Sequence, residues 1–347
     1  MFQDISIEDL LELKKQGKLT IIDVRSPSEY KNATIPGSLN IPFFNDEERA
    51  EIGTIYKQVS PQAAKERGLE IVSAKLPAFV KEFSKIEGKK AVFCWRGGMR
   101  SRTSATVLSL MGIKVARLNG GYRSYRNWVV EKLKTMQLQQ KAYILNGNTG
   151  SGKTTILHRL RAEGFPVIDL EGIANHRGSI FGQIGLEPNN QKSFDALLIE
   201  ELEKLKSASY FLLEGEGKRI GKVEVPDFLI EKKEQGTQLF IVMPIEERVT
   251  HILEDYQPWN HEQECLDAFN RIKRRIHTPI AKQIESDLIA GNYSSAVRLL
   301  LEYYYDPLYK HSTDQYPADK KIMINVKNID EAVQVIREHL ESAARPL

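Results

Sequence analysis

The chain has 347 residues, of which 41% are apolar and 27% charged, enough for two domains with separate cores and too apolar for a disordered protein. No apolar run approaches membrane-spanning length and the acidic start lacks a basic leader, so we expect a cytoplasmic protein without a membrane anchor. A net charge of +3 does not by itself indicate nucleic acid, and two separated cysteines, Cys94 and Cys265, exclude a disulfide framework.

The first part of the chain alternates helical and strand patterns. The predicted elements are, in order, a helix over Ile7–Lys15, strands over Leu19–Val24 and Lys90–Phe93, a helix over Ser101–Met111, a strand over Val115–Leu118, and a helix with a linker over Asn127–Gln140. This order predicts an α/β domain. It places Cys94 directly after a strand, where open α/β sheets bind their ligands.

The segment CWRGGMRS begins with this cysteine. Backbone N–H groups and guanidinium charge on such a turn stabilise a thiolate and hold a tetrahedral oxyanion. We therefore predict that Cys94 is a free, nucleophilic thiol and that Arg100 closes the loop. The oxyanion would lie against the residues between them: Trp95, Arg96, Gly97, Gly98 and Met99. The alternative is a small buried hydrophobic residue at a strand end.

The second part opens with a strand over Ala142–Asn146, a glycine-rich loop and a helix over Lys153–Glu163. The loop fits G-x-x-x-x-G-K-[ST], whose backbone amides cradle a diphosphate or triphosphate. Lys153 would reach the phosphate oxygens, and Thr154 would offer its hydroxyl to Mg²⁺. The predicted phosphate-binding residues are Gly147, Asn148, Thr149, Gly150, Ser151, Gly152, Lys153 and Thr154.

Further strands are predicted over Pro166–Leu170, Tyr210–Leu213, Leu239–Met243 and Lys321–Val326. The fold class is therefore α/β: a first α/β domain over residues 1–134, then a doubly wound P-loop NTPase-like domain with a helical C-terminal part over residues 135–347.

Secondary candidates follow two of these strands, where kinases place substrate-contacting groups. They are Asp169, Glu171, His176, Arg177, Glu214, Glu216 and Arg219. The two glutamates at 214 and 216 end a strand of Walker B character. A structural salt bridge is the alternative role for each.

Two basic runs are the candidate nucleic-acid surfaces. Between Cys94 and Arg126 there are seven basic residues and no acid, with aromatic residues among them, a pattern that resembles a phosphate-attracting surface with stacking groups. The candidates are Arg123 and Arg126 in this run, and Arg271, Lys273, Arg274 and Arg275 in a second, helical run. A solvated face is the alternative in each case.

Several motifs of the first domain are similar to those of rhodanese domains. They are IIDVRSPSEY at 21–30, IPGSLNIP at 35–42, the Cys94 loop, and LNGGYRSY at 118–125. Common sulfurtransferase loops have four residues between Cys and Arg, whereas here five separate Cys94 from Arg100. That is the spacing of protein tyrosine phosphatases, which bind a tetrahedral phosphate.

Together with the P-loop, four further segments resemble the tRNA 2-selenouridine synthase family: DLEGIANHRGSIFG at 169–182, LLEGEGKRIG at 212–221, EERV at 246–249 and YYDPLY at 304–309. The resemblance implies replacement of the C2 sulfur of a wobble 5-substituted 2-thiouridine by selenium, through an S-geranyl intermediate. Cys94 falls on the family's S-selanylcysteine position, and Gly147 to Thr154 on its phosphate loop.

The resemblance also implies the ligands: geranyl diphosphate and selenophosphate as co-substrates, no tightly bound cofactor, and the anticodon loop of a tRNA as partner. The residues leave open which tRNAs are substrates and what the oligomeric state is. Two other functions remain open at this point. One is a Cys-x5-Arg phosphatase fused to a small-molecule kinase, although Phe93 stands where tyrosine phosphatases carry His; the other is a non-catalytic tRNA-binding module.

Overall fold

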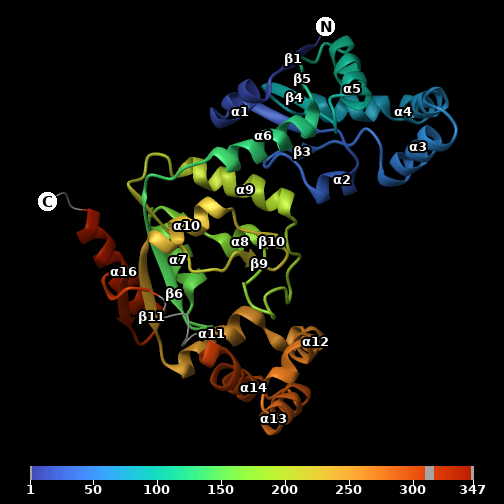
Figure 1. Cartoon of the computed structure of the whole chain (residues 1–347). Helices are drawn as coiled ribbons and strands as arrows, with labels where there is room; N and C mark the ends of the chain where they lie inside the picture. Colours follow the sequence, from blue (N-terminus) through green and yellow to red (C-terminus); the bar gives the residue numbers. More distant parts are fainter. Residues whose placement is uncertain (1, 309–315, 345–347) are drawn as a thin grey trace. The chain divides into compact units, whose positions relative to one another are not determined.

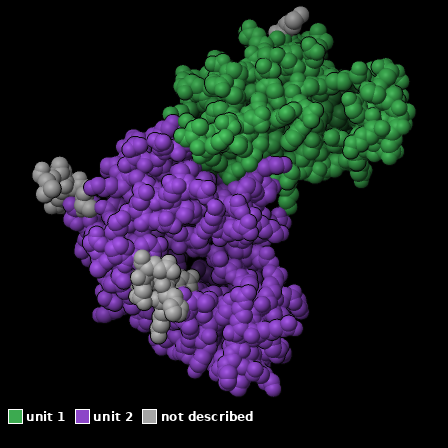
Figure 2. Space-filling view, in the orientation of Figure 1, with its two compact units in different colours: residues 1–135, 195–199 green, residues 136–194, 200–347 purple. Residues whose placement is uncertain are grey.

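The computed structural model describes residues 2–308 and 316–344 (Figure 1), so Tyr309 of the YYDPLY segment lies outside the described residues. The chain forms two compact units, shown in different colours in Figure 2. The first comprises residues 1–135 and 195–199, and the second comprises residues 136–194 and 200–347. Each unit has its own parallel sheet, and the predicted α/β fold class is confirmed.

The first unit contains a five-stranded parallel sheet with the order β1-β5-β4-β2-β3. The strands are β1 Gln3–Ile5, β2 Leu19–Asp23, β3 Leu39–Asn40, β4 Lys89–Phe93 and β5 Ala116–Leu118. The helices are α1 Ile7–Lys15, α2 Pro27–Asn32, α3 Asp46–Gln58, α4 Pro61–Ser84, α5 Met99–Leu110 and α6 Gly121–Thr135.

Both faces of this sheet are buried, as a parallel sheet requires. Ile22 and Val92 pack with Phe83 of α4 and Leu108 of α5 in one apolar cluster. The alternate strand residues, such as Ile21, point to the opposite face, and α1 contacts both β2 and α6. Cys94 therefore follows a strand that helices cover on both sides.

The elements α2, β3, α3 and α4 of the first unit were not predicted, and two further details differ from the prediction. The short edge strand β1 was not predicted; it pairs Gln3 with Ala116 of β5. Helix α6 begins at Gly121 rather than Asn127. The cause is backbone geometry: Gly120 and Gly121 have φ of 71° and 61°, so this glycine pair makes the turn itself and the helix starts at once.

The second unit has a parallel sheet with the order β12-β11-β6-β8-β7 and a two-stranded antiparallel β9–β10 ribbon. The strands are β6 Lys141–Gly147, β7 Val167–Ile168, β8 Tyr210–Glu214, β9 Arg219–Ile220, β10 Val223–Glu224, β11 Thr237–Val242 and β12 Lys321–Asn325. The helices around this sheet are α7 Lys153–Ala162, α8 Leu170–Ala174, α9 Gln191–Lys204, α10 Asp227–Gln235 and α16 Ile329–Ala344.

Apolar residues of β6 and β11 pack with α7 and α16 in the core of the second unit. A separate helical group lies between β11 and β12 in the chain: α11 Ile245–Tyr256, α12 Glu262–Ile272, α13 Thr278–Ile289 and α14 Tyr293–Leu300, with the turns η1 Pro258–Asn260, η2 Lys273–Arg275 and η4 Ala318–Lys320. A π-helical turn, η3, spans Leu301–Tyr305. The basic run predicted as helical is split, because α12 ends at Ile272 and Lys273–Arg275 forms a 3-10 turn.

A buried ion pair in the first unit generates a stability prediction. Asp23 accepts hydrogen bonds from Arg25 (Nη2, 2.6 Å) and Thr34 (2.9 Å), and both charged groups are almost fully buried. Asp23→Asn leaves a buried guanidinium without its counter-charge, so we expect the free energy of unfolding to fall by about 3 kcal/mol. Urea unfolding followed by circular dichroism measures this value.

The control is Asp4→Asn. Asp4 pairs with Arg117 at 2.7 Å, but its side chain is 44% exposed, and we expect a loss below about 1 kcal/mol. Equal losses in the two variants would contradict a special contribution from the buried pair.

Candidate functional site

The thiol of Cys94 is buried at the junction between β4 and the amino end of α5. Its Sγ lies 3.2 Å from the hydroxyl Oγ of Ser101, which is buried in the first turns of α5. The first N–H groups of a helix have no intrahelical acceptor and attract anions. The position therefore combines a thiol, a hydroxyl and a helix amino end.

The segment that leads into α6 packs against the loop after Cys94 and holds it through backbone hydrogen bonds. The N–H groups of Tyr122 and Arg123 donate to the carbonyl oxygens of Cys94 (2.8 Å) and Trp95 (2.9 Å). This approach requires glycine: a Cβ on Gly121 would lie 2.3 Å from the Cys94 carbonyl oxygen. The LNGGYRSY segment is therefore the support of the Cys94 loop.

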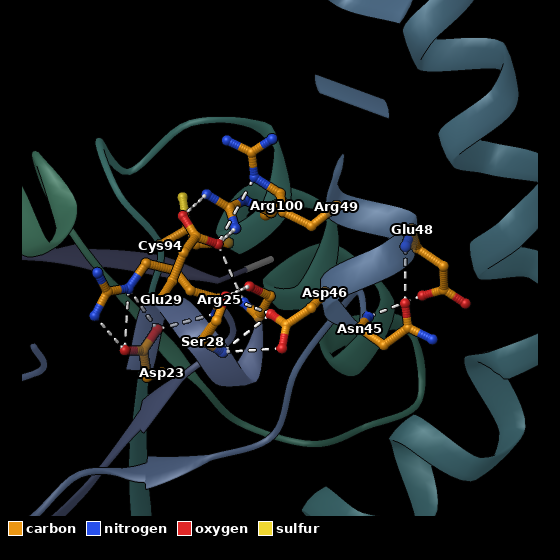
Figure 3. Close-up of polar contacts among 12 residues, drawn as sticks. Asp23, Arg25, Ser28, Glu29, Asn45, Asp46, Glu48, Arg49, Cys94 and Arg100 are labelled. Atoms are coloured by element: carbon orange, nitrogen blue, oxygen red, sulfur yellow. Dashed lines mark hydrogen bonds and ion pairs between the residues drawn. The ribbon is translucent and has the colours of Figure 1, made fainter. Parts of the chain in front are cut away.

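Arg100 is held in place by a carboxylate that the sequence did not indicate. Both terminal nitrogens of Arg100 donate to Glu29 of α2 (Figure 3). Burial raises the pKa of the Glu29 carboxyl, but the hydrogen bonds and charge of Arg100 outweigh it and hold the pKa below its ordinary value. Glu29 lies in the IIDVRSPSEY segment, so a motif marked the region without revealing the pairing.

The predicted basic and aromatic residues lie in different surroundings. Trp95 is 37% exposed and begins a series of neighbouring rings that continues through Tyr122 and Tyr125 to Trp128, with centroids 5.7, 6.0 and 6.1 Å apart. The side chains of Arg96 and Arg123 are exposed, whereas Arg126 donates to Asp195 at 2.7 Å. In the second run, Arg271, Arg274 and Arg275 are exposed and Lys273 is paired with Glu285 at 2.5 Å.

The second candidate site is the P-loop between β6 and α7. Gly150 and Gly152 have φ of 82° and 69°, which turns the backbone toward a bound ligand. Lys153 lies across the loop, with its Nζ donating to the Gly147 carbonyl oxygen at 3.2 Å. Thr154 donates to a carboxylate oxygen of Glu171 at 2.9 Å.

A pocket of about 610 Å³ opens beside this loop. It brings Lys153 and Thr154 together with three of the secondary candidates, Glu171, Arg177 and Glu216. The rest of its wall is mixed. Its apolar and aromatic residues are Ile180, Ile252, Tyr256, Tyr304, Tyr305 and Leu308, and its polar residues are Thr149, Thr155, His158, Ser179 and Asp255. The side chain of Arg177 lies over the Tyr256 ring, 4.6 Å from its centroid.

The remaining secondary candidates do not line this pocket. Glu214 is fully buried and accepts from the N–H of Leu170 at 3.0 Å, while Asp169 contacts His158 at 2.5 Å. His176 is buried beneath the β9–β10 turn, where a Cβ on Gly221 would lie 2.7 Å from its ring. Arg219 is mostly exposed and paired with Glu224.

The carboxyl groups near the P-loop have strongly displaced pKa values. Burial, and then the charge of Glu216, raise the pKa of Glu171 to about 8. Burial, and then the charge of Asp169, raise the pKa of Glu214 well above its ordinary value. Burial opposes ionisation of Asp169 too, but hydrogen bonds with Glu214 and His158 hold its pKa below the ordinary value. Glu171 therefore keeps a proton at neutral pH, close to where a phosphate would bind.

Two polar residues that the prediction left without a role, Arg248 and Asp306, meet at the P-loop. Asp306, just after the π-helical turn, accepts from Asn148 of the loop at 3.1 Å and from Arg248 at 2.8 and 2.7 Å. Arg248 also donates to the Thr149 carbonyl oxygen at 3.3 Å. The EERV and YYDPLY segments supply Arg248 and Asp306, and π-helical turns are frequent at functional sites. Only the motifs themselves could have drawn attention to these residues.

Two searches of the described ranges, 2–308 and 316–344, bear on ligands and membranes. Within them, no cluster of three or more His, Cys, Asp or Glu side chains has the arrangement of a metal site. None of the helices in these ranges combines the length and apolar character needed to span a bilayer.

These features define a class of protein: a rhodanese-like domain with a cysteine at the head of a glycine-rich loop, joined to a P-loop domain. The rhodanese-like domain family matches residues 6–127, and the family described as the tRNA 2-selenouridine synthase AAA domain matches residues 140–343. The chain belongs to the tRNA 2-selenouridine synthase family.

Individual relatives agree with this assignment over most of the chain. A tRNA 2-selenouridine synthase of Bdellovibrio bacteriovorus is 30% identical over 88% of this chain and 92% of its own length. One from Nitrosomonas europaea is 34% identical over 86% of this chain and 79% of its own length. Among solved structures, a rhodanese-related protein from Thermoplasma volcanium aligns with 37% of this chain and 93% of its own, at 24% identity and a TM-score of 0.23.

The high pKa of Glu171 generates a prediction on pH. The folded protein binds this proton more tightly than the unfolded chain, so the stabilisation is complete below the ordinary carboxyl pKa of 4.5 and is lost as the pH rises through about 8. Between about pH 5 and about pH 9, the unfolding temperature of the wild type should fall more than that of Glu171→Gln, which cannot ionise. Thermal unfolding across this pH range tests the difference.

Glu231→Gln is the control, because Glu231 is an exposed carboxylate on α10 of the same unit. It should show the wild-type pH dependence. Parallel curves for wild type and Glu171→Gln would contradict a proton held at Glu171.

Proposed function

We propose that this tRNA 2-selenouridine synthase works in two steps on separate loops: geranylation at the P-loop and selenium delivery at Cys94. The observation that carries the proposal is the P-loop pocket, in which a group of apolar and aromatic side chains, among them Ile252, Tyr305 and Leu308, lies beside the phosphate-binding end at Lys153 and Thr154. A terpene diphosphate needs a phosphate cradle and an apolar surface for its chain. Geranyl diphosphate meets both requirements.

A second, smaller apolar cavity supports the terpene assignment. It measures about 60 Å³ and shares Thr149, Ser179, Ile252, Tyr256 and Tyr305 with the wall of the P-loop pocket. Its other lining residues include Phe181, Ile184 and Leu301. An apolar chain whose diphosphate lies on the P-loop would extend along this shared wall. We therefore assign Ile252, Tyr256 and Tyr305 to terpene contact.

In the first step, the sulfur of 2-thiouridine attacks C1 of the geranyl group and the C–O bond to diphosphate breaks. The electron pair leaves with diphosphate, and the base loses its N3 proton. Lys153 and the loop amides stabilise the charge that accumulates on the leaving group. The oxygen atoms of Thr154 and Glu171 are of the type that Mg²⁺ prefers, and an ion bound there would neutralise diphosphate charge.

In the second step, selenium replaces the geranylated sulfur at C2. A thiocarbonyl sulfur leaves poorly, but once alkylated it departs as geranyl thiol, taking the electron pair of the C2–S bond and a proton. Selenophosphate is a tetrahedral oxyanion, and the Cys94 loop, with Arg100 held by Glu29, supplies positive charge for it. Cys94 carries the selenium as an S-selanyl group: its thiolate attacks the selenium of selenophosphate, the Se–P bond breaks, and the electron pair stays on phosphorus, which leaves as phosphite. The S-selanyl selenium then bonds to C2 as geranyl thiol leaves. A thiol reductant attacks the Cys94 sulfur and breaks the S–Se bond, so that 2-selenouridine leaves with that electron pair and Cys94 remains in a mixed disulfide that a second thiol reduces.

The tRNA would bind the first unit through its basic and aromatic surface. Arg96 and Arg123 are exposed near the Cys94 loop, and the Trp95 ring offers a partly exposed stacking surface for an unpaired base. Recognition of RNA commonly combines phosphate contacts with stacking of a splayed base. The wobble uridine is the base assigned to Trp95.

If the two steps use separate loops, a variant of each loop should lose one step and keep the other. Cys94→Ser should abolish selenium insertion but leave geranylation, so S-geranyl-2-thiouridine accumulates, since alkylation needs no enzyme thiol. Lys153→Ala should lower geranylation by at least about a hundredfold, because it removes the positive charge that stabilises the leaving diphosphate. The same variant should still convert tRNA that is already geranylated. Nucleoside mass spectrometry after single-turnover reactions measures both outcomes.

The control is Arg159→Ala, which removes an exposed cation of α7 that is paired with Asp330 and does not line the P-loop pocket. It should preserve both steps. If Cys94→Ser stops geranylation, or if the wild type requires ATP for either step, the two-step assignment is wrong.

The tRNA surface generates a further expectation. Arg96→Gln combined with Arg123→Gln should weaken tRNA binding and reduce the slope of log affinity against log salt by about two, one for each phosphate contact. Arg274→Gln combined with Arg275→Gln, a matched pair from the second run, should change neither quantity. The reverse result would move the tRNA site to the second unit. Filter binding over a range of salt concentrations distinguishes the two.

A further inference from the structure

The first unit contains a large cleft that the proposed steps have not used. It has a volume of about 1020 Å³ and lies between α3, α4 and the first turns of α5. Its apolar lining includes Phe43, Phe44, Ile52, Leu69, Val72 and Met99. We call it the α3–α4 cleft. Its volume lies at the upper end of the range for small-molecule sites, about 300 to 1,000 Å³.

The apolar surface of this cleft remains accessible to solvent. Leu69 is 67% exposed, Tyr56 is 59% exposed and Met99 is 57% exposed. Gly68 contributes to the opening because it has no side chain where α4 faces Phe44 and Ile52; a Cβ there would contact both at 3.6 and 3.7 Å. Large apolar side chains left exposed around a cavity indicate a binding site.

The cleft is continuous with the Cys94 loop. Met99, the last residue between Cys94 and Arg100, and Arg100 itself both line it. Phe43, Phe44 and Val72 of its wall belong to the same packed cluster as Cys94. A group attached to a base at the Cys94 loop can therefore enter the cleft at its Arg100 end.

The charge around the cleft is suited to a substrate that is apolar and attached to a polyanion. Its polar members include Arg49, Lys57, Lys65 and Arg100, and among the described residues no Asp or Glu lines it. Arg49 and Arg100 both pair with Glu29 of α2, so the remaining positive charge comes from the two lysines. The side chains of Lys57 and Lys65 are exposed. Cationic groups around an apolar floor match a terpene chain joined to an RNA backbone.

We propose that the α3–α4 cleft binds the geranyl group of S-geranyl-2-thiouridine in tRNA while the base lies at the Cys94 loop. This inference rests on the proposed two-step function and names the substrate group that the selenium site recognises. The cleft holds the geranyl chain before the C2–S bond breaks and receives it as geranyl thiol afterwards. It is distinct from the terpene site beside the P-loop, which binds the same chain as its diphosphate.

The test compares two substrates in single-turnover reactions with selenophosphate: an anticodon stem-loop carrying S-geranyl-2-thiouridine and the same stem-loop carrying S-methyl-2-thiouridine. The variants are Leu69→Glu and Tyr56→Glu, which place a carboxylate in the cleft at exposed positions. Leu110→Glu is the matched control, because Leu110 is 81% exposed on α5 and does not line the cleft. Circular dichroism checks that each variant is folded.

The wild type should convert the geranyl substrate with at least about tenfold higher kcat/KM than the methyl substrate, since burial of the longer apolar chain favours binding. The cleft variants should lose this preference through a loss on the geranyl substrate alone, and Leu110→Glu should keep it. Equal conversion of both substrates by the wild type, or variants that keep the preference or lose both activities together, would overturn the cleft assignment while the two-step function stands. A wild type that converts neither substrate would overturn the two-step function itself.

Photolabelling gives a second measurement that does not depend on variants. A stem-loop with a diazirine on its geranyl group, irradiated with the full-length wild type, should label peptides of α3, α4 or the Met99 region. Labelling confined to residues 136–344 would overturn the assignment.

Discussion

Both candidate sites depend on backbone that enters the left-handed region within a few residues of a strand end, where glycine alone is unstrained. Beside β4, Gly121 lets the start of α6 approach the Cys94 carbonyl oxygen so closely that no Cβ fits. After β6, a Cβ on Gly150 would lie 2.8 Å from the Arg248 carbonyl oxygen, and one on Gly152 would lie 2.4 Å from Ile329. Because these glycines have no Cβ, each loop packs closely against a neighbouring helix. This packing aligns the loop amides before a ligand binds. Preorganisation of this kind strengthens binding and transition-state stabilisation.

In the second unit, the charges around the P-loop set a further constraint on the site. A site for a diphosphate should be positive, yet Glu171 and Glu216 line the same pocket as Lys153. If both were ionised, the two carboxylates would repel each other and would also repel a phosphate. Burial further raises the free energy of their charged forms. The high pKa of Glu171 resolves the conflict in the empty site, because a proton removes one charge. A bound cation would resolve it in the loaded site, so the same pair of carboxylates suits either a proton or Mg²⁺ beside the phosphate.

Local patterns predicted the segments next to the two loops, and long-range contacts determined the rest. The predicted Ile7–Lys15 helix is confirmed with its bounds, because Ser6 caps it by accepting from the N–H of Asp9. Pairings such as Arg100 with Glu29, or Asp306 with Arg248, join residues 71 and 58 positions apart, and no periodicity encodes such separations. The motifs marked those residues without giving their partners. The α3–α4 cleft was not predicted either, because neither α3 nor α4 was predicted and the cleft arises from the packing of these two helices with α5.

In the proposed scheme, the enzyme recognises two chemically different parts of one intermediate. The basic and aromatic surface near Cys94 contacts features that substrate, intermediate and product all share, so it cannot distinguish among them. The α3–α4 cleft contacts the geranyl group, which only the intermediate carries on its uridine. Burial of that chain adds about 0.8 kcal/mol for each buried CH₂ group, which favours the intermediate over both other forms of the tRNA. Once the C2–S bond breaks, the binding free energy of the geranyl chain no longer contributes to the affinity for the tRNA. The chemical step itself therefore weakens the binding of the selenium-containing product and promotes its release.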